Sequence, residues 1–270
     1  MSMERVARDG LVLLGCGKMG SALLAGWLKA GVPAKSVWVL EPQPSDWLQG
    51  AGVHLNAGLP PAPAVALLAV KPQMMGAALP GLQALGNGTT LFISIAAGTT
   101  IATLEATLGA ATPIVRVMPN TPAMVGRGIS GLCGNARATA ADLALARNLM
   151  QAVGEVVDLD GEHQIDAVTA VSGSGPAYVF LLIEALAAAG EAEGLSADVA
   201  MRLARATVCG AGELAWQSDE TAAQLRINVT SPGGTTAAAL AVLMDDKTGL
   251  PPLMHRAVKA AADRGRELGR

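Results

Sequence analysis

The sequence predicts an α/β fold, in which a doubly wound parallel sheet is followed by an all-helical domain. Three observations carry this prediction. Short apolar runs alternate with helical patterns over the first 160 residues, a glycine-rich loop follows the first run, and strand patterns stop at Asp160-Gly161. Strand–helix–strand alternation is typical of a sheet covered by helices on both faces.

The strands are expected at short, nearly continuous apolar runs, because strands that are buried on both faces lack a polar side. They are 11–14, 37–40, 65–70, 91–95, 114–118, 129–133 and 155–159. The helices between them are expected at 21–30, 74–85, 99–108 and 138–150. The residues before Leu11 are expected to be disordered.

After residue 161 the pattern predicts helices alone, so the domains are expected at 1–161 and 162–270. Many positions in the second domain are alanine or other small apolar residues on all sides of the helix, which indicates burial against the domain or against another chain. Self-association is therefore expected. The predicted helices are 162–171, 176–193, 197–216, 219–227, 236–245 and 251–267.

Composition makes several functional classes unlikely candidates. The net charge is −3 without a Lys/Arg cluster, which disfavours a nucleic-acid surface. The three cysteines form no CxxC pair, and the three histidines lack metal-ligand spacing, so no metal is expected. The first residues are charged and lack the apolar segment of a secretion signal, so a cytoplasmic protein without a membrane span is expected.

The loop G-C-G-K-M-G at 15–20 joins the first strand to the first helix. Glycines at the GxGxxG positions allow a tight turn and a close backbone approach to a pyrophosphate, which the helix N-terminus attracts. The alternative is a purely structural turn. The context favours a Rossmann-like dinucleotide-binding domain, with cofactor contacts at Gly15, Cys16, Gly17, Lys18, Met19 and Gly20.

The second strand ends at Glu41, 21 residues after Gly20. An acidic residue at this place accepts hydrogen bonds from the ribose hydroxyls and repels a 2′-phosphate, so Glu41 favours NADH over NADPH. The alternative is that Glu41 caps the strand and points to solvent.

Two further strand ends resemble cofactor loops, because ligands bind at the carboxyl ends of such strands. One holds Ala69, Val70, Lys71 and Pro72, and the other holds Ala96, Ala97 and Gly98. The small residues of the second loop leave room for a flat nicotinamide ring. Lys71 either contacts a phosphate or ribose or is a solvated loop charge.

No lysine lies between Lys71 and Lys247. Reduction of a ketone needs a proton donor for the developing alkoxide, whereas an imine is basic enough to be protonated before hydride arrives. The sparse supply of acids therefore favours an imine substrate.

A glycine-rich loop with hydroxyls, V-T-S-P-G-G-T-T at 229–236, precedes a helix of the second domain. Such a loop suits a substrate carboxylate, held by Ser231 and by amides around Gly233, Gly234 and Thr235, with Thr236 directed at the ring nitrogen. The alternative is ordinary helix capping by Ser and Thr. For the loop at 172–176, capping and close packing are favoured.

Together these motifs resemble the pyrroline-5-carboxylate reductase family, through G-C-G-K-M-G (15–20), A-V-K-P-Q (69–73), S-I-A-A-G (94–98), R-V-M-P-N-T-P-A (116–123), S-G-S-G-P-A-Y-V-F (172–180) and V-T-S-P-G-G-T-T (229–236). The resemblance implies reduction of 1-pyrroline-5-carboxylate to L-proline by NAD(P)H, the last step of proline biosynthesis. It also implies a homodimer that can assemble further, up to decamers.

The resemblance assigns site residues as well. Thr236 is the catalytic residue, the substrate contacts are Ser231, Gly233, Gly234, Thr235, Thr236 and Glu162, and Asn56 and Asn228 join the cofactor contacts. Glu162 could equally be a charge at a helix start. Lys18 departs from the asparagine that is usual in this loop, and Glu41 departs from the small polar residues that suit a 2′-phosphate. The alternatives are a reductase of another imine or of a hydroxyacid, a dinucleotide sensor without turnover, and a structural dimerisation protein.

Overall fold

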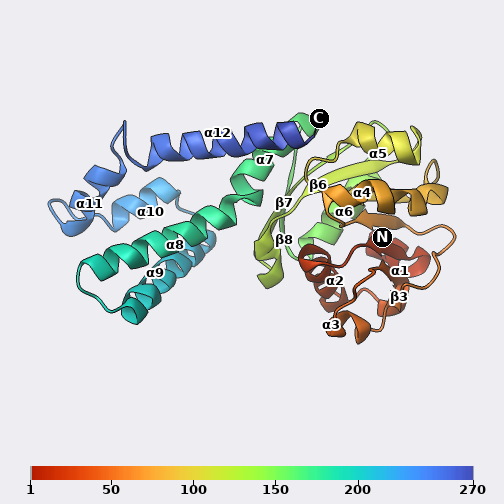
Figure 1. Ribbon diagram of the computed structural model, residues 1–270, viewed down its shortest axis with the longest axis horizontal. Helices are drawn as coiled ribbons and strands as arrows, with labels where there is room; N and C mark the ends of the chain where they lie inside the picture. Colours follow the sequence, from red (N-terminus) through yellow and green to blue (C-terminus); the bar gives the residue numbers. More distant parts are fainter. Residues whose placement is uncertain (1, 270) are drawn as a thin grey trace. The chain divides into compact units, whose positions relative to one another are not determined.

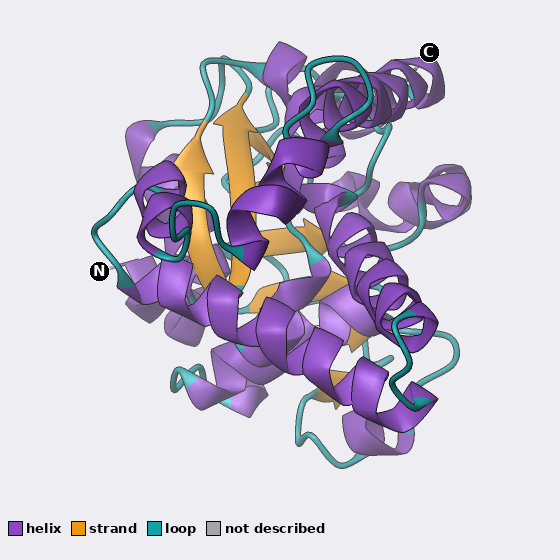
Figure 2. Ribbon diagram, turned by 90° about the vertical axis from the view of Figure 1, so that its left-hand side faces the viewer, coloured by secondary structure: helices purple, strands orange, loops and turns teal. Residues whose placement is uncertain are grey.

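The structure, a computed structural model, describes residues 2–269, and its central element is an eight-stranded sheet (Figure 1). The strand order is β3-β2-β1-β4-β5-β6-β7-β8. The strands are β1 (Leu11–Leu14), β2 (Val37–Leu40), β3 (His54–Leu55), β4 (Val65–Leu68), β5 (Leu91–Ser94), β6 (Ile114–Met118), β7 (Gly128–Gly134) and β8 (Gly154–Asp158). They are drawn in orange in Figure 2.

Neighbouring strands from β3 to β6 are parallel, as the sequence predicts, but β7 runs antiparallel to β6. β8 is parallel to β7, so the last two strands form a reversed pair at one edge. Parallel pairing in the rest of the sheet places the carboxyl ends of β1, β4 and β5 side by side, since Leu14 pairs with Leu68 and Leu68 with Ser94.

Helices cover both faces of this sheet, because alternate residues of each strand point to opposite sides. Leu11 and Leu13 pack in a core with Leu23, Trp27 and Leu149 from the helices of one face. Val12 and Leu14 belong to a second core on the other face. The helical elements are α2 (Lys18–Lys29), η1 (Ala34–Ser36), α3 (Asp46–Gln49), α4 (Pro72–Ala78), η2 (Leu79–Leu85), α5 (Ile101–Leu108), η3 (Thr121–Val125) and α6 (Ala140–Gln151).

The residues before β1 form helix α1 (Ser2–Asp9), which corrects the expectation of disorder. Val6 is fully buried in the sheet core, and Arg5 donates to the carbonyl of Thr89 at 2.7 Å. An apolar anchor and several long-range contacts, including the ion pair of Arg5 with Asp142, therefore order a segment whose composition is polar.

The chain divides by its packing into two units. The α/β unit runs to Gly173 and takes in the residues from Ala261 onward, while Ser174–Ala260 form the helical unit. The strand pattern ends near the expected boundary at 161/162, but the next residues still pack on the α/β unit. We call residues 162–173 the connector; it comprises η4 (Glu162–Gln164), α7 (Ile165–Val168) and the π-helical η5 (Thr169–Gly173).

The helical unit contains no strand within the described residues, as expected. Its helices are α8 (Gly175–Ala192), α9 (Ala197–Gln217), α10 (Ala222–Asn228), α11 (Thr235–Leu243) and the first part of α12 (Leu250–Leu268). α8 and α9 pack together through Ala187, Ala200 and Ala204.

Large apolar side chains of the helical unit are exposed in the single chain. Phe180 is 59% exposed, and Leu181, Leu182 and Leu186 lie along the same helix. Among residues 2–269, one continuous helical stretch, Glu162–Ala192, is long and apolar enough to cross a membrane by length and composition, with 11% of its most apolar window buried.

Candidate functional site

The three glycines of the first loop lie in different surroundings. Gly15 has φ +89°, and a Cβ there would lie 2.9 Å from the amide nitrogen of Val70. A Cβ on Gly20 would lie 2.5 Å from the carbonyl oxygen of Gly15. A Cβ on Gly17 would meet no atom within 4 Å.

The protein's own packing therefore explains Gly15 and Gly20 but gives no reason for Gly17. Gly17 is the N-cap of α2, and no side chain caps that helix end. A helix end that keeps its amides and carries no Cβ in front of them is suited to a diphosphate that approaches the backbone. The loop fits the phosphates of a dinucleotide.

The Glu41 carboxylate points at the glycine loop, which differs from the solvent-directed alternative. Its Oε2 accepts the amide hydrogen of Cys16 at 2.7 Å, and its Oε1 accepts that of Gln43 at 3.0 Å. Asn56 fixes this arrangement, because its side chain accepts from the Glu41 amide and donates to the Glu41 carbonyl, both at 2.9 Å. Asn56 adopts a positive φ of 48° to do so.

The second predicted loop, Ala69–Pro72, begins where β4 ends beside β1. The amide of Ala69 donates to the carbonyl of Leu14 at 2.8 Å, so the two loops start side by side at the carboxyl ends of their strands. Lys71 is exposed at the N-cap of α4, and Pro72 occupies the first turn.

The third predicted loop, Ala96–Gly98, follows β5 at the same edge. Ala96 is buried, whereas Ala97 and Gly98 are half-buried. Gly98 has φ +72°, and a Cβ there would lie 3.1 Å from the carbonyl oxygen of Leu268, near the end of α12. The residues from Ala261 onward therefore pack against this loop within the α/β unit.

Glu162 lies at the start of the connector and bonds within the α/β unit. Its Oε1 accepts from Arg116 Nη1 at 2.6 Å and from the amide of Ile101, the first residue of α5, at 2.7 Å. Arg116 and Glu162 flank a buried thiol: burial, together with the Glu162 charge, raises the pKa of Cys133 to about 11, although Arg116 opposes the shift.

Burial also raises the pKa of the Cys16 thiol, with a contribution from the Glu41 charge that a hydrogen bond to Ser21 opposes. Cys16 therefore contacts the site through its backbone amide, and its side chain is a neutral, packed group.

The loop before α11 is open. Gly234 is the N-cap of α11 and no side chain caps this end, whereas Thr221 caps α10 and Thr100 caps α5 through their hydroxyls. Ser231 contributes its carbonyl oxygen, which accepts from the Gly234 amide at 3.1 Å. The alternative, capping by Ser and Thr hydroxyls, is therefore not found at this helix, which leaves its first amides for another acceptor.

The substrate-loop residues differ in exposure. Ser231, Gly233 and Thr235 are exposed, while Gly234 and Thr236 are half-buried. Nearby, the side chain of Asn228 at the end of α10 donates to Glu220 at 3.0 Å and accepts from Gln224 at 2.8 Å.

The structure thus gathers the predicted cofactor residues of the first 98 positions at one edge of the sheet, and it places Asn228 and the 231–236 loop in the helical unit. Within residues 2–269, no cluster of three or more His, Cys, Asp or Glu side chains is placed to hold a metal. The sequence reasoning assigned no role to Arg116 or to Asn120, although a charged residue within an apolar strand is a visible signal.

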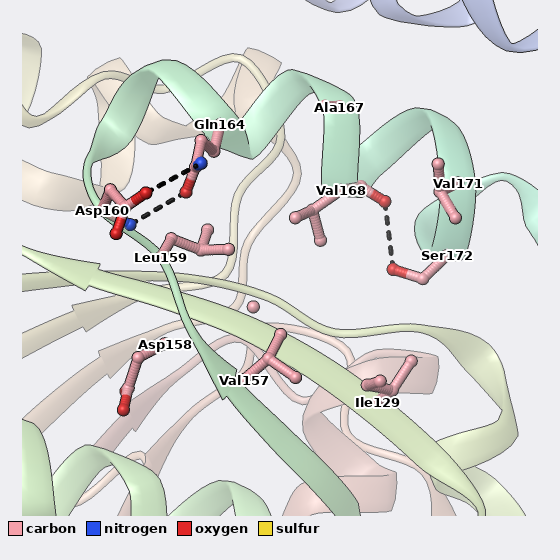
Figure 3. A pocket seen from close by; sticks show the side chains of 11 residues that line it. Ile129, Val157, Asp158, Leu159, Asp160, Gln164, Ala167, Val168, Val171 and Ser172 are labelled. Atoms are coloured by element: carbon pink, nitrogen blue, oxygen red, sulfur yellow. Dashed lines mark hydrogen bonds between the residues drawn. The ribbon is translucent and has the colours of Figure 1, made fainter.

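The α/β unit also has a cavity of about 520 Å³ between β7, β8 and the connector (Figure 3). Ile129, Val157, Val168 and Val171 give it apolar walls, and Gln164 bonds to Asp160 at its rim. None of the predicted site residues lines it. A smaller hollow of about 280 Å³ is lined by Pro72, Gly98 and Leu268, among others.

Two family models match the chain. Residues 162–268 match pyrroline-5-carboxylate reductase dimerisation, and residues 11–98 match NADP oxidoreductase, coenzyme F420-dependent. The first match covers the connector and the helical unit with its exposed apolar residues. The second covers all three loops at the edge of the sheet.

Relatives and solved structures agree with these matches. The chain is 43% identical to a pyrroline-5-carboxylate reductase from Pseudomonas aeruginosa, over 99% of this chain and 98% of the relative. It is 38% identical to the enzyme from Haemophilus influenzae, over 96% and 97%.

Among solved structures, a pyrroline-5-carboxylate reductase from Coxiella burnetii has a TM-score of 0.90 at 36% identity, covering 97% of this chain and 99% of that one. The Plasmodium falciparum pyrroline carboxylate reductase with NADP bound has a TM-score of 0.83 at 31% identity, with the same coverage. On full-length likeness at these identities, the chain belongs to the pyrroline-5-carboxylate reductase family.

Proposed function

We propose that this protein reduces 1-pyrroline-5-carboxylate to L-proline with hydride from NAD(P)H, the last step of proline biosynthesis. The observation that carries the proposal is the 43% identity with a pyrroline-5-carboxylate reductase over 99% of this chain, in which the glycine loop keeps an uncapped helix end at Gly17. It is an oxidoreductase that acts on a cyclic C=N bond.

The bound dihydronicotinamide would supply the hydride. The residues that would hold the cofactor are those at the sheet edge, Gly15, Cys16, Gly17, Lys18, Met19, Gly20, Glu41, Asn56, Ala69, Val70, Lys71, Pro72, Ala96, Ala97 and Gly98, together with Asn228. Three of these loops start at adjacent strand ends, which supports a ligand stretched along that edge. To contact the cofactor, Asn228 would give up its hydrogen bonds to Glu220 and Gln224.

The substrate carboxylate would bind at the open end of α11. Ser231 would offer its hydroxyl, and Gly233, Gly234 and Thr235 would offer backbone amides, which the helix dipole makes attractive to an anion. Thr236 would hydrogen-bond the ring nitrogen. The absence of a capping side chain at Gly234 supports this use of the loop.

Glu162 is the remaining predicted substrate residue. Its Oε1 already accepts two hydrogen bonds. A contact to substrate would therefore use the other carboxylate oxygen. The rate enhancement would come mainly from positioning, since holding two reactants in place is worth roughly 7–11 kcal/mol.

NADH is the proposed preferred cofactor. The Glu41 carboxylate faces the glycine loop at 2.7 Å from the Cys16 nitrogen, where ribose hydroxyls would replace or join its donors. A 2′-phosphate at that place would meet a like charge.

The test is steady-state oxidation of NADH and NADPH with pyrroline-5-carboxylate at equal cofactor concentrations. The expected result is turnover with both and a higher kcat/KM for NADH. The variant Glu41→Ser should lower the NADH/NADPH ratio by about tenfold or more, because it removes one charge. Turnover that favours NADPH in the parent chain would reject the role of Glu41, and binding of NADH without imine-dependent oxidation would reject the reductase in favour of a sensor.

The homodimer is the proposed working unit, with further assembly up to a decamer, in the cytoplasm. Matching residues 162–268 to a dimerisation family supports the dimer. Light scattering of the purified chain measures the subunit number directly, and a monomer at micromolar concentration would contradict it.

A further inference from the structure

Arg116 is a guanidinium inside a strand whose other four residues are apolar, and it is only 5% exposed. Its Nη1 donates to Glu162 Oε1 at 2.6 Å. The same oxygen accepts the amide hydrogen of Ile101 at 2.7 Å. One carboxylate oxygen therefore joins β6 to the first residue of α5.

These contacts hold both ends of the loop that contains Ala96–Gly98. Arg116 is paired in register with Ser94, the last residue of β5, where the loop begins. The Ser94 hydroxyl accepts from the amide of Ala96 at 3.4 Å. The loop ends at Ile101, whose amide is bonded to Glu162. The start of the loop is thus held by the backbone pairing of β5 with β6, and its end is held through Ile101 by the Arg116–Glu162 pair.

The same strand end also holds the connector. Glu162 is the first residue of the connector, and Asn120, two residues after β6, donates to the carbonyl of Ser172 near its other end at 3.1 Å. The Oδ1 of Asn120 accepts from the amide of Ile129 at 2.9 Å, so this side chain is itself fixed. The loop and the connector are thus tied to one strand.

Stability alone does not account for an ion pair at this place. Burying a guanidinium costs free energy, and apolar residues of similar volume often serve the fold as well or better. An ion pair with a shared acceptor restrains geometry instead, because its hydrogen bonds form only when the loop, the strand and the connector are correctly aligned.

We propose that Arg116 is a positioning residue for the reaction: acting through Glu162, it fixes the Ala96–Gly98 loop under the nicotinamide ring. This inference rests on the proposed function, since that function places the nicotinamide at this loop. In this role Arg116 acts through its ion pair with Glu162.

The test compares NADH with ADP-ribose, which has the adenosine and both phosphates but no nicotinamide. In the variant Arg116→Met, calorimetry is expected to show an NADH Kd about tenfold higher, while the ADP-ribose Kd stays within about twofold. Arg116→Lys retains the charge and should recover part of the difference. A general loss of folding would weaken both ligands alike, so equal weakening, or no change in either, overturns the proposal.

Turnover gives a second readout. Because a small misplacement of the ring lowers the rate of hydride transfer, kcat should fall about 10- to 100-fold, with a smaller change in KM for the imine. Arg147→Met is the matched control: Arg147 forms an ion pair with Asp158, away from these loops, and its loss should leave the ligand ratio and kcat unchanged.

If Arg116→Met does not fold, as judged by circular dichroism and its melting temperature, the same ratio is measured on Arg116→Lys, which must then show a smaller shift in the same direction. The binding ratio needs no turnover. Absence of imine reduction by the parent chain would therefore reject the proposed function, whereas an unchanged ligand ratio would reject the role of Arg116.

Discussion

The two units of this protein bury apolar surface very differently. In the α/β unit, large side chains such as Trp27 and Phe92 are fully enclosed by residues of the same unit. In the helical unit, the buried cluster consists of Ala187, Ala200 and Ala204, while Phe180 and its neighbours are exposed. The first unit has a complete core in one chain, and the second has a surface that needs a partner.

The same difference separates the two predicted ligand loops. At the glycine loop, the packing of Gly15 and Gly20 against neighbouring backbone fixes the loop before any ligand arrives. The loop before α11 is held only by local hydrogen bonds, from Gly234 to Ser231 and from Thr230 to the end of α10. Cofactor binding should therefore depend on the shape of the glycine loop within one chain. Substrate binding should depend more on the association of two chains.

The largest effect is expected from a charge on the exposed apolar face of the helical unit. Phe180→Asp should raise the dimer dissociation constant at least about a hundredfold, because an unpaired carboxylate is costly to bury at an interface. Sedimentation velocity measures the shift, and imine reduction should fall with it. Val125→Asp, at a residue of the α/β unit that is 76% exposed, is the control. If Phe180→Asp remains a fully active dimer, the two units do not differ as described.

The second-largest effect separates the role of the glycine loop in binding NADH from its role in stability. Gly17→Ala should weaken NADH binding about 10- to 100-fold while the free energy of unfolding changes by less than about 1 kcal/mol, because its φ of −68° suits alanine. Calorimetry and thermal melting measure the two quantities. Gly81→Ala, also in open space, should change neither. Unaltered NADH affinity in Gly17→Ala would show that no phosphate lies there.

The third effect tests the loop of the helical unit. Thr236→Ala should lower kcat/KM for the imine about tenfold, equivalent to one hydrogen bond, and leave the NADH Kd unchanged. Thr221→Ala should do the opposite: it removes a capping bond from α10 and costs about 1 kcal/mol of stability with kcat/KM intact. An unchanged kcat/KM in Thr236→Ala would exclude its catalytic role.

The smallest effect appears only at alkaline pH. The pKa of Cys133 is raised to about 11 in the folded chain from an ordinary value of 9.0. The unfolded chain therefore loses this proton first, so the free energy of unfolding should fall as pH rises from about 9 to 11, by at most about 2–3 kcal/mol. Chemical denaturation at several pH values measures this slope. It should be shallower in Cys133→Ala, and identical slopes would show that the thiol titrates normally.

Much of the α/β unit could be predicted because its strands are buried on both faces and therefore appear as apolar runs. The expected strand at 114–118 coincides with β6. The two-residue β3 was not predicted because a pair of residues has no periodicity. Helix α1 was not predicted because its order depends on Val6 and Arg5 meeting residues far along the chain.

Site residues could be predicted where their signal lies within a short stretch of the sequence. The glycine loop was predicted from a motif that directly follows a strand, whereas the direction of the Glu41 side chain was left open and comes from the structure. The partner of Glu162 was not predictable, because Arg116 lies 46 residues away and only the sheet brings them together. The missing cap on α11 was also hidden, since the helix was expected at 236–245, whereas its N-cap is Gly234, which has no side chain to cap it.

The packing boundary has a consequence for how the chain is made. The α/β unit is interrupted after Gly173 and resumes at Ala261, so the helical unit is an insertion with both ends anchored in the same body. During translation, the contact of Leu268 with Gly98 has to wait until every helix of the insertion has been synthesised. The nascent chain therefore exposes the apolar residues of α8 before the first unit is complete, and during this interval that surface is open to aggregation.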